Sequence, residues 1–339
     1  METIAPTTQF AETDEPLPAA SLLEVRDLTV DYLTARGPAR AVDHVSFSIA
    51  PGEVFGLAGE SGCGKSTAAH AILRLIKPPG QISGGQILFH GRDILDLSPL
   101  GLKDFRWRQA SIVFQSAMNA LNPVTPLGAQ IADAIRAHEK TSKAGAWERA
   151  AELFGLVGID SRRLKSYPHE LSGGMRQRAF IAMALALRPE MIVMDEPTTA
   201  LDVVVQRDIL QQIQDLQRQF GFSILFITHD LSLLVQFSTR IAIMYAGKIV
   251  EQARSGELFQ HPHHPYTVGL MNSFPSIRGE KKRLQGIPGA PPDLVTPPPA
   301  CRFAARCPHI MTECTQVYPD PREVSPGHWA ACHLYERRL

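Results

Sequence analysis

The sequence predicts an α/β fold in which a parallel sheet is interrupted by a helical insert. Short apolar strands alternate with helices before about residue 115 and again after about residue 190. Between about 125 and 190 almost all signals are helical, with Ala-rich segments at 129–138, 144–157 and 175–187. A glycine-rich loop at 59–66 lies between an apolar strand and a helix, a position typical of ligand-binding loops in α/β folds.

The N-terminal half supplies most of the predicted strands. They cover 22–33, 41–49, 54–58, 86–89 and 111–114. The first two lie on either side of a Gly-Pro turn at 37–38, and the third follows Pro51-Gly52. A helix is predicted over 65–76, because Pro78-Pro79-Gly80 ends it.

Strands return after the helical insert. They are predicted at 191–194, 223–228, 240–245 and 248–251. Between the first two, Ile209, Ile213, Leu216 and Phe220 recur at intervals of four, three and four, which indicates a helix over 204–220 with one buried face.

The two ends of the chain differ in composition from this core. Residues 1–20 hold Thr, Pro and acids with little to bury, so we expect a disordered tail. After about 261 the composition shifts to Pro, His, Cys and Arg, which predicts a separate extension over 262–339 with little regular structure. The core domain is therefore expected over 21–261, with its insert at about 116–188.

Composition and charge exclude several classes of protein. Lys plus Arg and Asp plus Glu each number 34 in 339 residues, so the basic excess typical of nucleic-acid binding is absent, and we expect no nucleic-acid partner. The 44% hydrophobic content is globular, and no run approaches the roughly 18 apolar residues that span a bilayer. Without a basic and apolar leader, and with five cysteines, the chain is expected in a reducing cytoplasm.

The segment 59–66 reads G-E-S-G-C-G-K-S and matches the phosphate-binding pattern G-x-x-x-x-G-K-S/T. Glycines let several N–H groups point at one phosphate, and the helix behind them adds about half a positive charge. Lys65 is expected to reach the β and γ phosphates, and the Ser66 hydroxyl to bind magnesium. The predicted nucleotide contacts here are Gly59, Ser61, Gly62, Cys63, Gly64, Lys65, Ser66 and Thr67. Cys63 is interpreted as a small residue in a tight turn rather than a redox group.

Two acids end the apolar strand at 191–194. Asp195 is expected to hold magnesium, directly or through water, and Glu196 to act as general base or to position the attacking water. Alone, such acids are typical of a solvated strand end. Beside a phosphate loop they indicate a nucleotide triphosphatase.

Four further segments carry a family resemblance. The run 171–175, L-S-G-G-M, resembles the signature sequence of ABC-type ATPases, with Met175 in place of the usual Gln. Gln115 resembles the Q-loop glutamine, Asp202 the D-loop aspartate and His229 the H-loop histidine. The resemblance implies a P-loop NTPase with a RecA-like core, an antiparallel β subdomain and a helical insert.

The resemblance also implies roles for these residues. Glu196, His229 and Gln115 would be catalytic, and Gln115 would join Ser66 and Asp195 at magnesium. Tyr32 would stack on adenine. Ser172, Gly173 and Gly174 begin a helix and so form a second anion site, which in ABC proteins completes, with Asp202 nearby, the ATP site of a partner domain. Two such domains close on two ATP molecules.

The C-terminal extension indicates which group of ABC-type ATPases the chain resembles. The runs H-H-P-Y-T at 263–267, I-P-G-A-P-P at 287–292, C-R-F at 301–303 and R-C-P at 306–308 resemble the C-terminal extension of oligopeptide and dipeptide importer ATPases, the D-type subunits. This implies work at the cytoplasmic face of the inner membrane. The expected partners are two membrane-spanning permease subunits, a paralogous second ABC ATPase and, indirectly, an extracytoplasmic solute-binding protein. Relatives of these importers also carry nickel or oligosaccharides, so the resemblance does not identify the transported solute. The alternative to a role in import is a soluble ABC ATPase with a non-transport role.

Four of the five cysteines lie in this tail, at Cys301, Cys307, Cys314 and Cys332. Four thiolates on a Pro-rich segment suit a metal centre that supplies folding energy. Some members of the importer family hold a 4Fe-4S cluster here, and zinc and plain thiols are the alternatives. Arg302 and Arg306 are expected to neutralise the thiolates. The histidines of the H-P-H-H-P turn at 261–265 are expected to be exposed polar residues.

Overall fold

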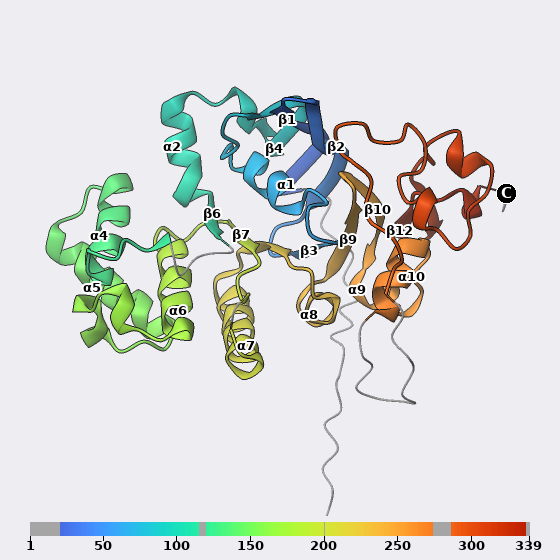
Figure 1. The fold of residues 1–339 in the computed structure, drawn as a ribbon. Coiled ribbons are helices and arrows are strands. Elements are labelled where there is room, and N and C mark those ends of the chain that lie inside the picture. The colour runs from blue at the N-terminus through green and yellow to red at the C-terminus, as the bar shows by residue number, and fades with distance from the viewer. Residues whose placement is uncertain (1–20, 115–119, 200, 274–285, 337–339) are drawn as a thin grey trace, which may run out of the picture.

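Two sheets and a cluster of helices form the chain in the computed structural model, which describes residues 21–114, 120–199, 201–273 and 286–336 (Figure 1). One sheet has four antiparallel strands in the order β2-β1-β4-β5. The other has eight strands in the order β11-β12-β10-β9-β3-β8-β7-β6. The larger sheet positions the site.

The four-stranded sheet is the antiparallel subdomain that the resemblance implies. Its strands are β1 (Leu23–Thr34), β2 (Gly37–Ile49), β4 (Gly80–Phe89) and β5 (Arg92–Asp93). Leu23, Val25 and Leu28 on β1 are buried, and they belong to the core cluster that includes Ala68 and Ala69 of the first helix. This packing places the sheet over the helix that follows the phosphate loop.

The centre of the large sheet is parallel. Its strands are β6 (Ala110–Val113), β7 (Met191–Asp195), β8 (Ser223–Ile227), β3 (Val54–Ala58) and β9 (Arg240–Tyr245). Every residue of β3, β7 and β8 is buried, as expected for strands covered on both faces. Parallel strands present their carboxyl ends at one edge, which is where open α/β sheets bind ligands.

Five helices accompany this sheet and its connections. They are α1 (Lys65–Ile72), α2 (Pro99–Arg108), α7 (Val203–Phe220), α8 (Leu231–Phe237) and α9 (Ser255–Gln260). In α7 Ile209, Ile213 and Leu216 are buried as the spacing predicts, and Leu210 is buried beside them, but Phe220 at the end of the helix is 40% exposed. The predicted first helix ends earlier than expected, at Ile72, and α2, α8 and α9 were not predicted.

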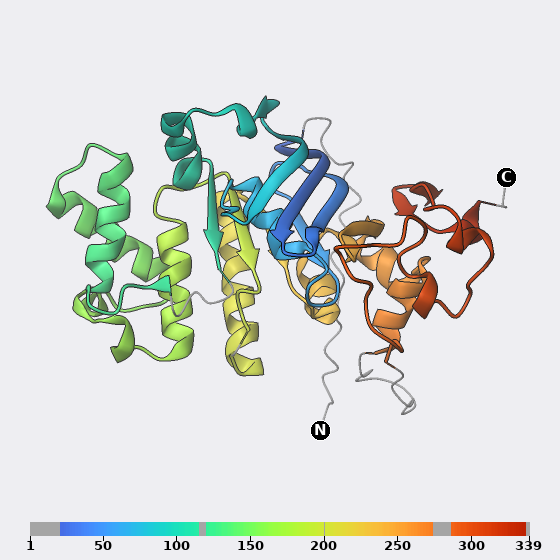
Figure 2. The same cartoon turned by 45° about the horizontal axis from the view of Figure 1, so that its top comes forward.

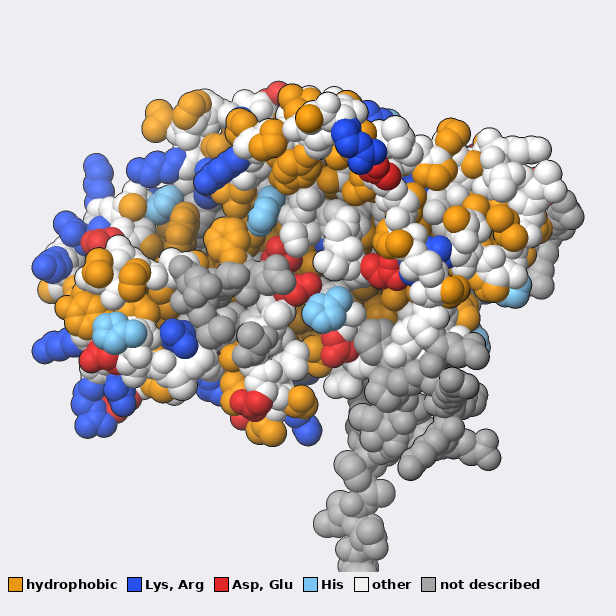
Figure 3. All heavy atoms as spheres, viewed as in Figure 1, with side chains coloured by type: hydrophobic (Ala, Val, Ile, Leu, Met, Phe, Trp, Pro, Cys, Tyr) orange, Lys and Arg blue, Asp and Glu red, His pale blue; other side chains and the backbone are white. Residues whose placement is uncertain are grey.

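The helical insert lies at one end of the molecule in both views (Figures 1 and 2). It consists of α4 (Leu127–His138), α5 (Lys143–Leu156) and α6 (Gly173–Ala184), with short 3₁₀ turns at Ser161–Lys165 and Pro168–Glu170. On the face drawn in Figure 3, Lys and Arg side chains gather mainly over this end, and acidic side chains lie nearer the centre. On this face the basic side chains are therefore unevenly distributed, although the net charge of the chain is zero.

The C-terminal extension lies at the opposite end (Figure 1). It begins with α10 (Pro265–Asn272) and ends with β11 (Arg322–Ser325) and β12 (His328–Ala330). β12 pairs with β10 (Lys248–Arg254), so the extension adds two strands to the core sheet. The extension was predicted to have little regular structure, and these two strands were not foreseen, because strands of three and four residues are too short to show an alternating pattern. No helix in the described ranges has both the length and the apolar character needed to span a bilayer.

Candidate nucleotide-binding site

The phosphate loop connects the buried strand β3 to α1. Gly59 has φ 149° and Gly64 has φ 108°, in the region that favours glycine. A Cβ on Gly59 would lie 2.1 Å from the Met244 carbonyl oxygen, and one on Gly64 would lie 2.1 Å from the Ala41 carbonyl oxygen. These glycines therefore let the loop pass directly against two neighbouring backbones.

Lys65 points back into the loop. Its Nζ donates to the carbonyl oxygens of Gly59, at 2.7 Å, and Glu60, at 2.9 Å, and the residue is buried. The ammonium is thus held among the loop's backbone groups, where it would meet a phosphate. Burial raises the pKa of the Cys63 thiol, so this cysteine stays protonated and supports the prediction of a small packing residue.

Ser66 and Asp195 meet although 129 residues separate them. The Ser66 hydroxyl donates to Asp195 Oδ1 at 2.9 Å, because β7 ends beside the start of α1. Burial raises the pKa of Asp195. A divalent cation beside the carboxylate would favour its charged form, and a hydroxyl with a carboxylate is a donor set that Mg²⁺ accepts. These two residues fit the magnesium site that the sequence predicts.

Glu196 and His229 lie at the carboxyl ends of adjacent parallel strands, β7 and β8. His229 Nδ1 is 3.2 Å from Glu196 Oε1, and Thr199 donates to Glu196 Oε2 at 3.0 Å. Glu196 has φ 46°, which is uncommon for a non-glycine residue. Two of the three predicted catalytic residues, Glu196 and His229, are therefore brought together.

The signature residues lie away from this loop. Ser172 caps the N-terminus of α6, its Oγ accepting from the Met175 amide at 3.3 Å. α6 contacts β6 at the sheet edge, whereas the phosphate loop follows β3, with β8 and β7 between them. Three strand spacings separate β3 from β6 by about 14 Å. Gly173 and Gly174 begin the same helix.

The remaining predicted residues have different outcomes. Asp202 caps α7 and accepts from the Val205 amide at 3.0 Å. Tyr32 lies on β1 opposite Ala39 and Gly80, and its stacking on adenine stays a prediction. Thr67 lies in the first turn of α1. Gln115 lies outside the described residues.

The four cysteines of the extension are free thiols that influence one another. Burial is the main cause of the raised pKa values, to about 11 for Cys301 and about 12 for Cys332, and the other thiols of the group contribute to both. The His309 amide donates to Cys307 Sγ at 3.4 Å. Across the described part of the chain, no group of three or more His, Cys, Asp or Glu side chains is arranged to hold a metal ion.

The structure overturns two expectations for the extension. Arg306 pairs with Glu60 and Arg302 with Asp43, so both guanidinium groups are engaged by carboxylates rather than by the thiols. In the H-P-H-H-P turn His261 is exposed, but His264 is only 2% exposed. His264 caps α10, its Nδ1 accepting from the Tyr266 amide at 3.0 Å, and burial lowers its pKa to about 4.

Sequence reasoning also missed two residues at the loop, Tyr266 and Arg306. Both belong to the extension and both contact Glu60. Only the charge of Glu60 inside a phosphate loop could have suggested that a cation lies beside it.

This combination of loop, acidic strand end and signature helix defines an ATPase of the ABC class. Two family models match the chain: ABC transporter over residues 42–199 and the C-terminal region of oligopeptide/dipeptide transporters over residues 250–314. The dimeric structure of a bacterial ABC transporter cassette is 27% identical, with a TM-score of 0.62, and the match covers 69% of this chain and 98% of that one.

Relatives that match this chain over nearly their whole length identify its family more narrowly. A "probable peptide ABC transporter ATP-binding protein" of Sinorhizobium fredii is 47% identical over 92% of this chain and 94% of its own length. The dipeptide transport ATP-binding protein DppD of Bacillus subtilis is 43% identical over 94% of this chain and 96% of its own. The chain belongs to the family of ATP-binding proteins of oligopeptide and dipeptide ABC transporters.

Proposed function

We propose that this ATPase powers the import of peptides across the cytoplasmic membrane. The observation that carries the nucleotide chemistry is the Ser66–Asp195 hydrogen bond, which unites the phosphate loop with the acidic strand. Lys65, Ser66 and the loop amides would bind the phosphates of ATP, and Asp195 would complete the magnesium site. The resemblance of the extension to peptide transporters supports peptides as the cargo.

The chain's own groups supply the catalytic steps. Magnesium, when bound, neutralises charge on the phosphates. Glu196 accepts a proton from the attacking water or orients it, and His229, 3.2 Å away, holds the Glu196 carboxylate. Gln115 is proposed as a magnesium contact from the resemblance alone.

The active unit is proposed to be a pair of ATPase domains. α6 carries Ser172 and Gly174 at an edge of the sheet, so its exposed start is available to a second phosphate loop. The similar ABC cassette is itself described as dimeric. The partner would be a paralogue, and both would bind two permease subunits at the cytoplasmic face, with a solute-binding protein on the other side.

We further propose that the four thiols of the extension hold a metal centre, a 4Fe-4S cluster in preference to zinc. The support is the presence of four thiols in one extension, where the Cys301 amide donates to the Cys314 carbonyl oxygen at 3.2 Å and the His309 amide donates to the sulfur of Cys307. Because the described side chains form no ready-made metal site, metal binding would have to draw these thiols together. A metal would keep these thiols deprotonated despite their burial. Its role would be structural.

Reconstitution in liposomes with the permeases and the binding protein tests the proposed transport. Labelled peptide should accumulate only with internal ATP, and Lys65→Ala should abolish accumulation. ATP hydrolysis without any peptide-dependent uptake would favour the non-transport alternative. Hydrolysis unaffected by Lys65→Ala would refute the nucleotide site itself.

A further inference from the structure

Two side chains of the C-terminal extension form hydrogen bonds with Glu60 of the phosphate loop. Arg306 Nη1 lies 2.8 Å from Glu60 Oε2, and Nη2 lies 2.9 Å from Oε1, so the pair is bidentate. The Arg306 side chain is 5% exposed and that of Glu60 is 26% exposed. Most of the solvent that would screen this pair is therefore excluded.

A second residue of the extension holds the backbone of Glu60. The Glu60 amide donates to Tyr266 Oη at 2.8 Å, and the Tyr266 ring is fully buried against Tyr245 and Phe303. The carbonyl of Glu60 accepts from Lys65 Nζ. The amide, the carboxylate and the carbonyl of this residue are thus all engaged, two of them by the extension.

Arg306 is itself fixed from several sides. Its Nε donates to the Pro288 carbonyl oxygen at 2.9 Å, and its Nη1 to Tyr245 Oη at 3.3 Å. Pro288 belongs to the extension and Tyr245 ends β9. The guanidinium therefore contacts the extension and the core sheet as well as the loop. Arg306 therefore also has partners outside the loop.

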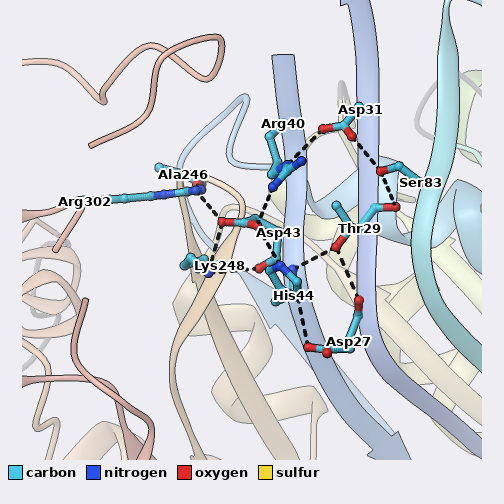
Figure 4. A network of polar contacts seen from close by, with 10 residues as sticks. All are labelled: Asp27, Thr29, Asp31, Arg40, Asp43, His44, Ser83, Ala246, Lys248 and Arg302. Atoms are coloured by element: carbon cyan, nitrogen blue, oxygen red, sulfur yellow. Dashed lines mark hydrogen bonds and ion pairs between the residues drawn. The ribbon is translucent and has the colours of Figure 1, made fainter. Parts of the chain in front are cut away.

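A neighbouring set of contacts joins the extension to β2 and to the turn that follows β9 (Figure 4). Arg302 donates to the Asp43 carboxylate and to the Ala246 carbonyl oxygen, and Lys248 lies 3.0 Å from the same carboxylate. The next residue, Gly247, donates its amide to the Cys63 carbonyl oxygen at 2.9 Å. The extension therefore supports the loop at Glu60 directly and at Cys63 through the 246–247 turn.

We propose that Arg306 and Tyr266 are positioning residues of the phosphate loop, through which the C-terminal extension sets the affinity for ATP. Without Arg306, the Glu60 carboxylate would be an unpaired negative charge in the loop that binds the triphosphate. Like charges repel strongly where water is scarce, so Arg306 reduces the repulsion between Glu60 and ATP. Tyr266 fixes the loop backbone next to Gly59. This inference rests on the nucleotide site proposed above.

The test measures ATP affinity and hydrolysis of the full chain, with and without magnesium. Arg306→Gln should raise the dissociation constant and the KM for ATP by about tenfold, with kcat changed by less than about twofold, since the truncation leaves a charge unpaired. In the double variant Glu60→Gln, Arg306→Gln most of this loss should be recovered, because no carboxylate is then left to repel ATP. Arg306→Lys should be intermediate, since it keeps the charge and loses the bidentate contact.

A matched control comes from another pair between the extension and the core. Arg36 pairs with Asp293, but the two side chains are 68% and 42% exposed. Arg36→Gln should therefore leave ATP affinity unchanged.

The outcomes separate the alternatives. An Arg306→Gln variant that binds ATP like the parent overturns the inference, and so does a double variant no better than the single one, which would point to damaged folding. If Arg306→Gln does not fold, Tyr266→Phe carries the test: loss of one hydrogen bond should weaken ATP binding about threefold, and unchanged affinity overturns the inference. A parent chain that binds no ATP would instead refute the proposed function.

Discussion

The hydroxyl of Ser66 donates to the carboxylate of Asp195 at 2.9 Å and so joins the start of α1 to the end of β7. The two strands that lead to these residues, β3 and β7, are separated in the sheet by β8 alone. Because β8 leads to His229, three neighbouring strand ends supply the phosphate loop, the predicted general base and the histidine that contacts it. The chemistry is therefore concentrated along one short edge of a fully buried set of strands.

Glu196→Gln should leave ATP binding nearly unchanged and lower turnover by about a hundred- to ten-thousandfold, the usual contribution of a general base or water-positioning group. Binding should persist because Lys65 and the loop amides contact the phosphates. Binding of labelled ATP and steady-state hydrolysis measure the two effects separately.

The matched control is Glu190→Gln at the opposite end of the same strand. Glu190 pairs with His90 through a 2.7 Å contact between exposed side chains, so its loss should cost little. Hydrolysis by Glu196→Gln within a factor of about two of the parent would show that Glu196 is a spectator.

Much of this site could be predicted because its signals are local. A loop pattern between a strand and a helix, and two acids after a buried strand, each lie within a few consecutive residues. The contacts of Glu60 with Arg306 and of Asp43 with Arg302 could not be predicted, because they join residues 246 and 259 positions apart. The pairing of β12 with β10 could not be predicted either, because pairing of so short a strand depends on backbone groups rather than on a side-chain pattern.

Ser172→Arg should impair the ATP site of the partner domain and leave binding at the chain's own phosphate loop intact. Its side chain would occupy the start of α6, a helix that contacts the edge strand β6, whereas the phosphate loop follows β3, with β8 and β7 between the two strands. Ser172→Arg can be paired with a partner whose phosphate-loop lysine is replaced by alanine. One intact site, at this chain's own phosphate loop, should then remain, whereas none would remain if each signature served its own loop. Full activity of dilute monomers, independent of concentration and partner, would contradict pairing.

Anaerobically purified protein should contain iron and acid-labile sulfide in equal amounts and show broad visible absorption. Cys307→Ser should lose both, since a thiolate ligand is removed. Cys63→Ser, which alters the one cysteine outside the group, should keep them. Zinc without iron would exclude the cluster and retain the site; absence of any metal would exclude both.

The stability of the chain should fall in mild acid because of His264. Burial lowers its folded-state pKa to about 4, below the usual value of 6.5. Above pH 6.5 both states are neutral, and stability from this residue is fully present. As the pH falls towards 4 the unfolded chain gains a proton that the folded chain does not, so the free energy of unfolding should drop by about 2–3 kcal/mol.

His264→Asn isolates this effect. Asparagine can also cap α10 by accepting from the Tyr266 amide, and it does not titrate. Glu251, whose carboxylate accepts from the His264 backbone amide, keeps the same contact in both proteins, so its own acid sensitivity cancels in the comparison. Urea unfolding should therefore show a smaller loss of stability between neutral and acid pH for the variant. Equal losses in the two proteins would mean that His264 takes up its proton in the folded state as readily as in the unfolded one.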